Sequence, residues 1–127
     1  MDERAALRRL DELLPDAGDD AAVVDGLVVT TDMLHRSTDF PPETTRYTMG
    51  WRAVGASLSD IAAMGGEPVA TVAVYGAPEL DWAEIEEFVL GAQAVCEQAG
   101  GAYVGCDLER RTRGRCQNDA IVPHTRR

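Results

Sequence analysis

The sequence predicts an α+β or α/β domain. Two observations lead to this fold class: short β-branched runs alternate with two long stretches of helical spacing, and glycine or proline punctuates the joins between them. Their order, namely hairpin, helix, strand, helix, strand, is typical of such domains. With 127 residues and 45% hydrophobic content, the chain is long enough to bury one core.

The N-terminal part is predicted to be a helix followed by a β-hairpin. Residues 4–14 carry leucines at helical spacing. Ala21–Val24 and Leu27–Thr31 are short β-branched runs, and the Asp-Gly pair between them is a strong hairpin signal. A long loop is expected over 33–46, because two consecutive prolines there forbid regular structure.

Two helices, each leading into a strand, are predicted for the middle of the chain. Helical spacing runs over about 48–64, and 68–77 has the composition of a buried strand. A D-x-x-E capping box that begins at Asp81 opens the second helix, and Gly100 ends it. Another strand is expected to start at 102–105.

The charge balance is strongly acidic. There are 22 acidic residues against 12 basic ones, and every basic residue is arginine. Such a lysine-free surface suits a cytoplasm of very high salt, so a salt-loving archaeon is the predicted source. Nucleic acid and anionic membranes are disfavoured as partners, since both need a basic patch. No apolar run approaches the roughly 20 residues of a bilayer span, and the N-terminus is unlike a signal peptide, so a cytoplasmic protein is expected.

The last part of the chain reverses this charge. Residues 1–109 hold 21 acids and 6 arginines, whereas 110–127 hold 6 arginines and 1 acid. Little apolar periodicity remains in 109–127. This basic tail is therefore expected to be disordered, or not to be the native continuation, as after a slipped reading frame. A basic nucleic-acid-binding arm stays open as an alternative.

Acidic residues stand at the ends of the predicted strands and inside one predicted helix. They are Asp19, Asp20, Asp32, Asp60 and Asp107. Asp60 is the clearest case, because its helix is otherwise small or apolar and an unpaired buried carboxylate is costly. With no lysine to pair with it, Mg²⁺ is the natural partner, and Thr30 and Thr31 offer further oxygen ligands.

Simpler interpretations stay open for each acid taken alone. Asp19 and Asp20 suit a turn, Asp32 could cap the following segment, Asp60 could be a partly solvated helix residue, and Asp107 could be a turn acid. The three cysteines form no CxxC pair and are interpreted as incidental.

Phosphate chemistry also points to a metal ion. The chain has no G-x-x-x-x-G-K-[ST] loop, no G-x-G-x-x-G motif and no lysine. If the domain handles nucleotide phosphates, Mg²⁺ must neutralise their charge, and phosphoryl transfer needs mainly positioning and charge stabilisation.

Three runs at these spacings resemble the thiamine-monophosphate kinase family, which belongs with aminoimidazole ribonucleotide synthetase and selenophosphate synthetase in one superfamily. The resemblance covers about residues 1–108. The runs are Gly18-Asp19-Asp20-Ala21, Thr30-Thr31-Asp32-Met33 and Ser59-Asp60-Ile61-Ala62-Ala63-Met64-Gly65.

The resemblance implies transfer of the ATP γ-phosphoryl group to thiamine phosphate. It implies an α+β fold like the N-terminal domain of aminoimidazole ribonucleotide synthetase, a mixed sheet with two helices packed on it, as a half-barrel that pairs in a homodimer. Cys106 and Asp107 fall on an ATP-binding segment, and Asp39 on a substrate contact. The positions that fall on the family's Mg²⁺ ligands are Asp20, Thr30, Thr31, Asp32, Asp60 and Asp107.

The sequence departs from the family pattern in three places. The loop reads Leu34-His35-Arg36-Ser37-Thr38-Asp39-Phe40 where the family more often has V-E-G-V-H-F, and Cys106 replaces a glycine. After Leu108 no further family sequence is recognised, although the family continues into a second domain. The chain alone is therefore expected to be poorly active or inactive.

Two other functions remain in view. One is another enzyme of the same superfamily, such as aminoimidazole ribonucleotide synthetase. A product assay with each phosphate acceptor would distinguish it from a thiamine-monophosphate kinase. The other is a non-catalytic Mg²⁺–nucleotide-binding or dimerisation module.

Overall fold

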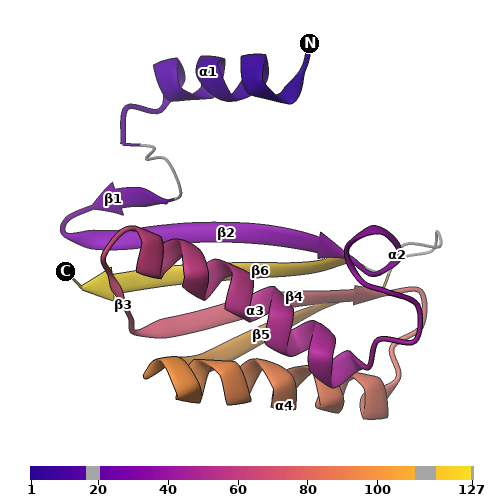
Figure 1. The fold of residues 1–127 in the computed structure, drawn as a ribbon. Helices are drawn as coiled ribbons and strands as arrows, with labels where there is room; N and C mark the ends of the chain where they lie inside the picture. The colour runs from indigo at the N-terminus through magenta and orange to yellow at the C-terminus, as the bar shows by residue number, and fades with distance from the viewer. Residues whose placement is uncertain (17–20, 111–116, 127) are drawn as a thin grey trace.

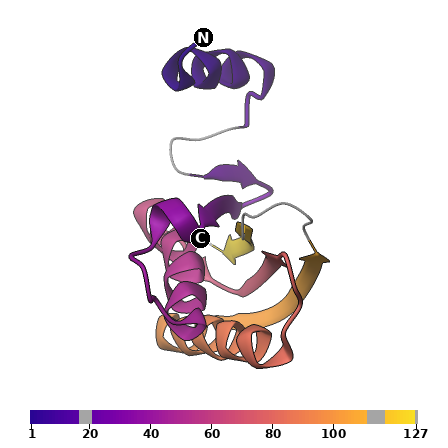
Figure 2. The same ribbon diagram turned by 90° about the vertical axis from the view of Figure 1, so that its right-hand side faces the viewer.

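A computed structural model describes residues 1–16, 21–110 and 117–126 as one mixed β-sheet with two long helices on one face (Figure 1). The elements in chain order are α1 (Glu3–Leu13), β1 (Ala22–Val24), β2 (Leu27–His35), α2 (Arg36–Asp39), α3 (Arg46–Ala63), β3 (Glu67–Pro68), β4 (Ala70–Ala77), α4 (Trp82–Ala99), β5 (Ala102–Arg110) and β6 (Gln117–Arg126). Helix α1 stands apart from the sheet and buries none of its residues (Figures 1 and 2).

The strands run in the order β1-β2-β6-β4-β5, and β3 pairs with β6. Only β4 and β5 are parallel, and α4 is the crossover between them. The other pairs are antiparallel. The predicted α+β class is therefore confirmed, with a mixed sheet that carries α3 and α4 on the same face (Figure 2).

Local chemistry explains the predicted turns and helix ends. Asp25 and Gly26 have φ values of 51° and 75°, as a two-residue hairpin of the primed type requires. The Asp81 side chain accepts a hydrogen bond from Ala83 N at 2.9 Å at the start of α4. Gly100 ends α4 with φ 85°, a conformation that glycine adopts without a steric penalty.

The predicted loop over 33–46 is partly ordered. Strand β2 continues to His35, a single helical turn forms α2, and α3 begins at Arg46 behind the N-cap Thr45. β2 extends this far because β6 provides backbone partners along it, from Leu27 to His35. The two prolines end up between α2 and α3.

The tail is also more ordered than the sequence predicts. β5 continues to Arg110, and Gln117–Arg126 forms β6, which pairs with β2 on one side and β4 on the other. Backbone hydrogen bonding explains the difference: without β6, the facing edges of β2 and β4 would both be unpaired. This pairing does not depend on the apolar side-chain pattern on which the expectation of disorder rested.

Helices α3 and α4 cross at unusually short range. A Cβ atom at Gly50 would lie 2.1 Å from the Phe88 carbonyl oxygen, and one at Gly91 would lie 1.9 Å from that of Tyr47. Only glycine permits this approach. The main core cluster lies between the helices and β4, where the Tyr75 ring packs against Phe88 with centroids 5.2 Å apart.

Candidate functional site

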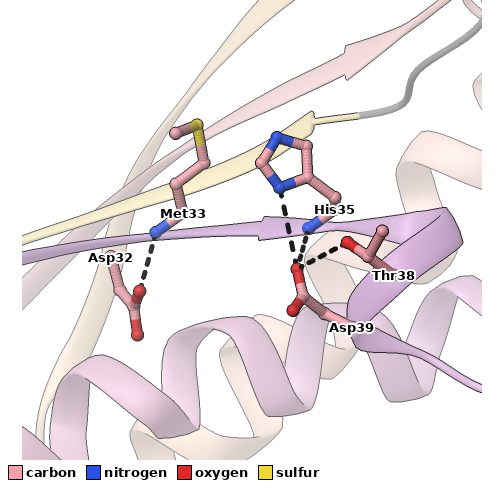
Figure 3. A network of polar contacts seen from close by, with 5 residues as sticks. All are labelled: Asp32, Met33, His35, Thr38 and Asp39. Carbon is pink, nitrogen blue, oxygen red and sulfur yellow. Dashed lines mark hydrogen bonds and ion pairs between the residues drawn. The ribbon is translucent and has the colours of Figure 1, made fainter. Parts of the chain in front are cut away.

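Strand β2 presents three of the predicted metal ligands on two different faces. Thr30 is buried on the side that faces the helices, whereas Thr31 is exposed on the opposite side. Asp32 returns to the helix side, is half-buried, and accepts a hydrogen bond from Met33 N at 2.8 Å (Figure 3). Thr30 and Asp32 can therefore contribute to one site on that side, and Thr31 lies across the sheet from them.

Asp60 lies in the last turn of α3, on the helix that packs against β2. Its neighbour Ile61 is fully buried in a cluster with Ala21 and Val28, which holds the C-terminal end of α3 against the hairpin. The Asp60 side chain itself is half-buried. Asp60 thus lies on the helix side of the sheet, as Thr30 and Asp32 do.

Cys106 and Asp107 lie on the far strand of the sheet. Asp32 pairs with Ala120 of β6, Ala120 with Ala73 of β4, and Ala73 with Cys106 of β5. Three strand spacings separate the backbones of Asp32 and Cys106 by about 14 Å. Asp107 directly follows Cys106 along β5, so its side chain points to the opposite face of the sheet, where it is exposed. The structure therefore does not bring Asp107 and Asp32 around one ion within a single chain.

The remaining predicted ligand, Asp20, lies outside the described residues, as does Asp19. Among the side chains described in 1–16 and 21–110, no three His, Cys, Asp or Glu residues form a group that could hold a metal ion. Mg²⁺ commonly takes only one or two carboxylates and completes its shell with water and substrate phosphates. Whether Thr30, Asp32 and Asp60 form such a partial site stays a prediction of the sequence.

Asp39, the predicted substrate contact, serves as a local cap. Its Oδ2 accepts hydrogen bonds from His35 N at 2.6 Å and Thr38 Oγ1 at 3.5 Å, and lies 3.7 Å from His35 Nδ1 (Figure 3). These contacts fix the turn of α2 at the end of β2. Asp39 lines none of the larger cavities of the described structure.

Burial raises the pKa values of the two described thiols. For Cys96 and Cys106 the cause is removal from water, which disfavours the thiolate. Burial also raises the pKa of the Tyr103 hydroxyl, and the neighbouring Cys106 thiol raises it further. Cys106 is therefore a neutral thiol at ordinary pH, and its position beside Asp107 adds no negative charge to a phosphate site.

Sequence reasoning missed the site around Arg46. This side chain is only 8% exposed and lines a cavity of about 610 Å³ between α2, the following loop and the N-terminal ends of α3 and α4. Its Nη2 donates to Glu84 Oε2 at 3.4 Å. One sequence signal could have found it: an arginine directly after an N-cap is electrostatically unfavourable, since the helix N-terminus carries partial positive charge.

The sequence profile of the AIR synthase related protein, N-terminal domain, matches residues 18–125. The chain belongs to this family. The profile match extends beyond Leu108, where the sequence resemblance was expected to end, and includes most of β6.

Within the family, the chain is similar to thiamine-monophosphate kinases. It is 59% identical over 109 residues to the thiamine-monophosphate kinase of Halobacterium salinarum, with 86% of this chain and 38% of the relative covered. The solved thiamine-monophosphate kinase from Stenotrophomonas maltophilia is 32% identical, with a TM-score of 0.70, and the match covers 94% of this chain and 40% of that one. The chain thus spans well under half the length of these relatives.

A third comparison supports the fold alone. The structure of AaThiL complexed with AMPPCP and TMP aligns with a TM-score of 0.84 at 24% identity, covering 97% of this chain and 41% of that one. The fold of the family's N-terminal domain is therefore shown for this chain. Among the described helices, none has the length and hydropathy of a bilayer span.

Proposed function

We propose that the chain is the Mg²⁺- and ATP-binding N-terminal domain of a cytoplasmic thiamine-phosphate kinase. In this reaction the γ-phosphoryl group of ATP is transferred to thiamine phosphate, giving ADP and thiamine diphosphate. The observation that carries the proposal is the 59% identity to the Halobacterium salinarum kinase over 109 residues. The proposed binding domain is 1–108, and the basic segment 109–127 that follows it adds β6 to the same sheet.

The proposed metal ligands divide into two groups. Thr30, Asp32 and Asp60 would hold one ion from the helix side of β2, and Asp20, which lies outside the described residues, is the fourth proposed ligand. Thr31 and Asp107 lie on the exposed face but three strands apart, so each would bind a separate ion or water that reaches the ATP phosphates. Mg²⁺ then supplies the positive charge that a lysine-free chain lacks.

The proposed roles in substrate binding rest on position alone. Cys106 and Asp107, inside β5, would contact ATP phosphate, and the thiol would be neutral there. Asp39 would contact thiamine phosphate through Oδ1, since the described contacts of its carboxylate all involve Oδ2. No general base is assigned, because positioning and charge neutralisation carry most of phosphoryl transfer.

The test is a product assay on the purified 127-residue chain with ATP, Mg²⁺ and each candidate phosphate acceptor. We expect little or no thiamine diphosphate, since the relatives are more than twice as long. Efficient turnover of thiamine phosphate would show that this domain needs no further partner. Turnover of a different acceptor would instead favour another enzyme of the superfamily.

A dimerisation module is a second candidate, favoured by apolar side chains on the face of the sheet opposite α3 and α4. Met33 and Val104 are 49% and 62% exposed there. A second copy facing this side would cover them and form the homodimer expected from the sequence. Sedimentation in multimolar KCl tests this, and a monomer at high protein concentration would contradict pairing.

A further inference from the structure

Helix α1 carries an apolar face that nothing in the described chain covers. Its leucines and the leucine of its C-cap are between 46% and 74% exposed, and the helix buries none of its residues; they are Leu7, Leu10, Leu13 and Leu14. An isolated helix of 11 residues is marginal in water, so α1 gains stability from a surface that covers this face. In Figures 1 and 2, α1 lies beyond β1, at the opposite end of the molecule from α4.

The helix pair α3–α4 has an apolar groove on its solvent-exposed side. The two helices are closest at Gly50 and Gly91, and the groove, with a volume of about 450 Å³, opens on the C-terminal side of that crossing. Its lining includes Trp51, Ala56 and Val95. Trp51 is 38% exposed and offers a large apolar contact, while the small residues allow another helix to approach closely. The groove therefore has the character of a helix-binding site.

The groove and α1 match in length. The α3 residues that line the groove run from Trp51 to Ala62, which is a rise of about 16 Å along the helix. The 11 residues of α1 also rise by about 16 Å. One copy of α1 therefore fits along the whole groove.

Charge gives this pairing a direction. Ala62 and Ala99 place the C-terminal ends of α3 and α4 at one end of the groove, and neither helix has a basic residue in its last turn to offset the partial negative charge there. The N-terminal half of α1 can do so, because residues 2–9 hold three arginines against two acids. Residues 10–16 hold three acids and no basic residue, and they would then lie toward Arg52, which takes part in none of the described ion pairs.

We propose that α1 docks into the α3–α4 groove of a second copy of this chain, and that the exchange is reciprocal. A second copy is the occupant because α1 stands away from its own groove and carries the length and charge that the groove lacks. Reciprocal exchange closes a two-fold dimer in which both apolar surfaces of each chain are covered. Two helix contacts form a small interface, so the association is weak and depends on protein concentration. This interface is separate from the sheet face that carries Met33 and Val104.

Sedimentation of the full chain in multimolar KCl, from about 1 µM to about 1 mM, measures this association. Acrylamide quenching of Trp51 is followed in a Trp82→Phe background, since Trp82 is 70% exposed and would mask the signal. We expect a dimer to form as the concentration rises and Trp51 to become protected in parallel, because the leucine face of α1 covers it.

Leu10→Gln should weaken the association at least about fivefold, because the centre of the leucine face becomes polar. The substitution leaves the core intact, since α1 buries none of its residues. Leu90→Gln is the matched control: this leucine of α4 is 49% exposed, close to the 46% of Leu10, and lies outside the groove. Ala56→Gln tests the groove itself, because a longer polar side chain occupies the space of the docked leucines, and it should weaken the association similarly.

A monomer at every concentration, or equal weakening by Leu90→Gln, would overturn the proposal. So would association that Val104→Gln abolishes and Leu10→Gln leaves unchanged, because the sheet face would then be the interface. Protection of Trp51 in a monomer would place α1 in the groove of its own chain and would also contradict exchange. None of these outcomes bears on the proposed kinase function, which is measured by product formation.

Discussion

At the scale of single residues, Asp60 is the most informative predicted ligand. It shares the helix side of the sheet with Thr30 and Asp32, and the end of α3 that carries it is fixed by the buried Ile61. Removing its charge without changing its shape should therefore affect cation binding rather than folding.

We expect Asp60→Asn to weaken Mg²⁺ binding at least about tenfold, because one hard anionic oxygen ligand becomes neutral. Asp25→Asn is the control, since it removes the same charge from the hairpin at a positive φ that asparagine tolerates. Titration of Mg²⁺ in the presence of AMPPCP measures both. Equal effects of the two substitutions would mean that Asp60 is not a ligand.

The acidic residues could be identified from the sequence, but the face of the sheet on which each side chain lies could not. The predicted strand ends explain why Asp32 and Asp107 attracted attention. Simple alternation along β5 from Tyr103, which packs on the helix side, would place Asp107 on that side too. A register shift opposite Thr71 and Val72 adds one residue and turns Asp107 to the other face. No feature of the local sequence indicates this register shift.

At the scale of elements, the α3–α4 crossing depends on two reciprocal glycines. In the sequence, a glycine within a helical pattern indicates only a weak helix former. The structure shows why residues 50 and 91 must be small: each backbone lies directly against a carbonyl oxygen of the other helix. Caps and hairpin turns were predictable because their chemistry is local, whereas this contact joins positions far apart in the chain.

Gly91→Ala is therefore expected to destabilise the protein by about 2–3 kcal/mol, because a Cβ would lie 1.9 Å from the Tyr47 carbonyl oxygen and force the helices apart. Gly55→Ala in α3 is the matched control. Its Cβ would meet its nearest neighbour at an ordinary 3.6 Å, so it should stabilise by about 0.5–1 kcal/mol. Urea unfolding in constant salt measures both. Similar free energies of unfolding for both variants would contradict the close crossing.

At the scale of the whole molecule, the acidic charge couples stability to salt. The net charge is −10 and no lysine is present, so carboxylates repel one another at low ionic strength. We expect the midpoint of thermal unfolding to rise by at least about 10 °C between 0.1 M and 3 M KCl, as repulsion is screened and burial is strengthened. A midpoint independent of KCl would count against adaptation to high salt.

The place of residues 117–126 in the sheet could not be predicted from the sequence. The reversal of charge after residue 109 gave no sign that 117–126 would form a central strand. Strand pairing in the middle of a sheet uses backbone groups that every sequence has, apart from proline. The composition of the tail therefore carried little information about its place in the sheet.

The proposed function requires this domain to perform its part of thiamine-phosphate phosphorylation. The most direct measurement replaces the matching N-terminal region of the Halobacterium salinarum kinase by residues 1–108 and assays thiamine diphosphate formation with ATP and Mg²⁺. The 59% identity makes a folded chimera a fair expectation, and circular dichroism checks it. We expect the chimera to form thiamine diphosphate. Asp60→Asn should reduce its turnover at least about tenfold, since an anionic Mg²⁺ ligand is lost. A folded chimera that forms no thiamine diphosphate would contradict the assignment.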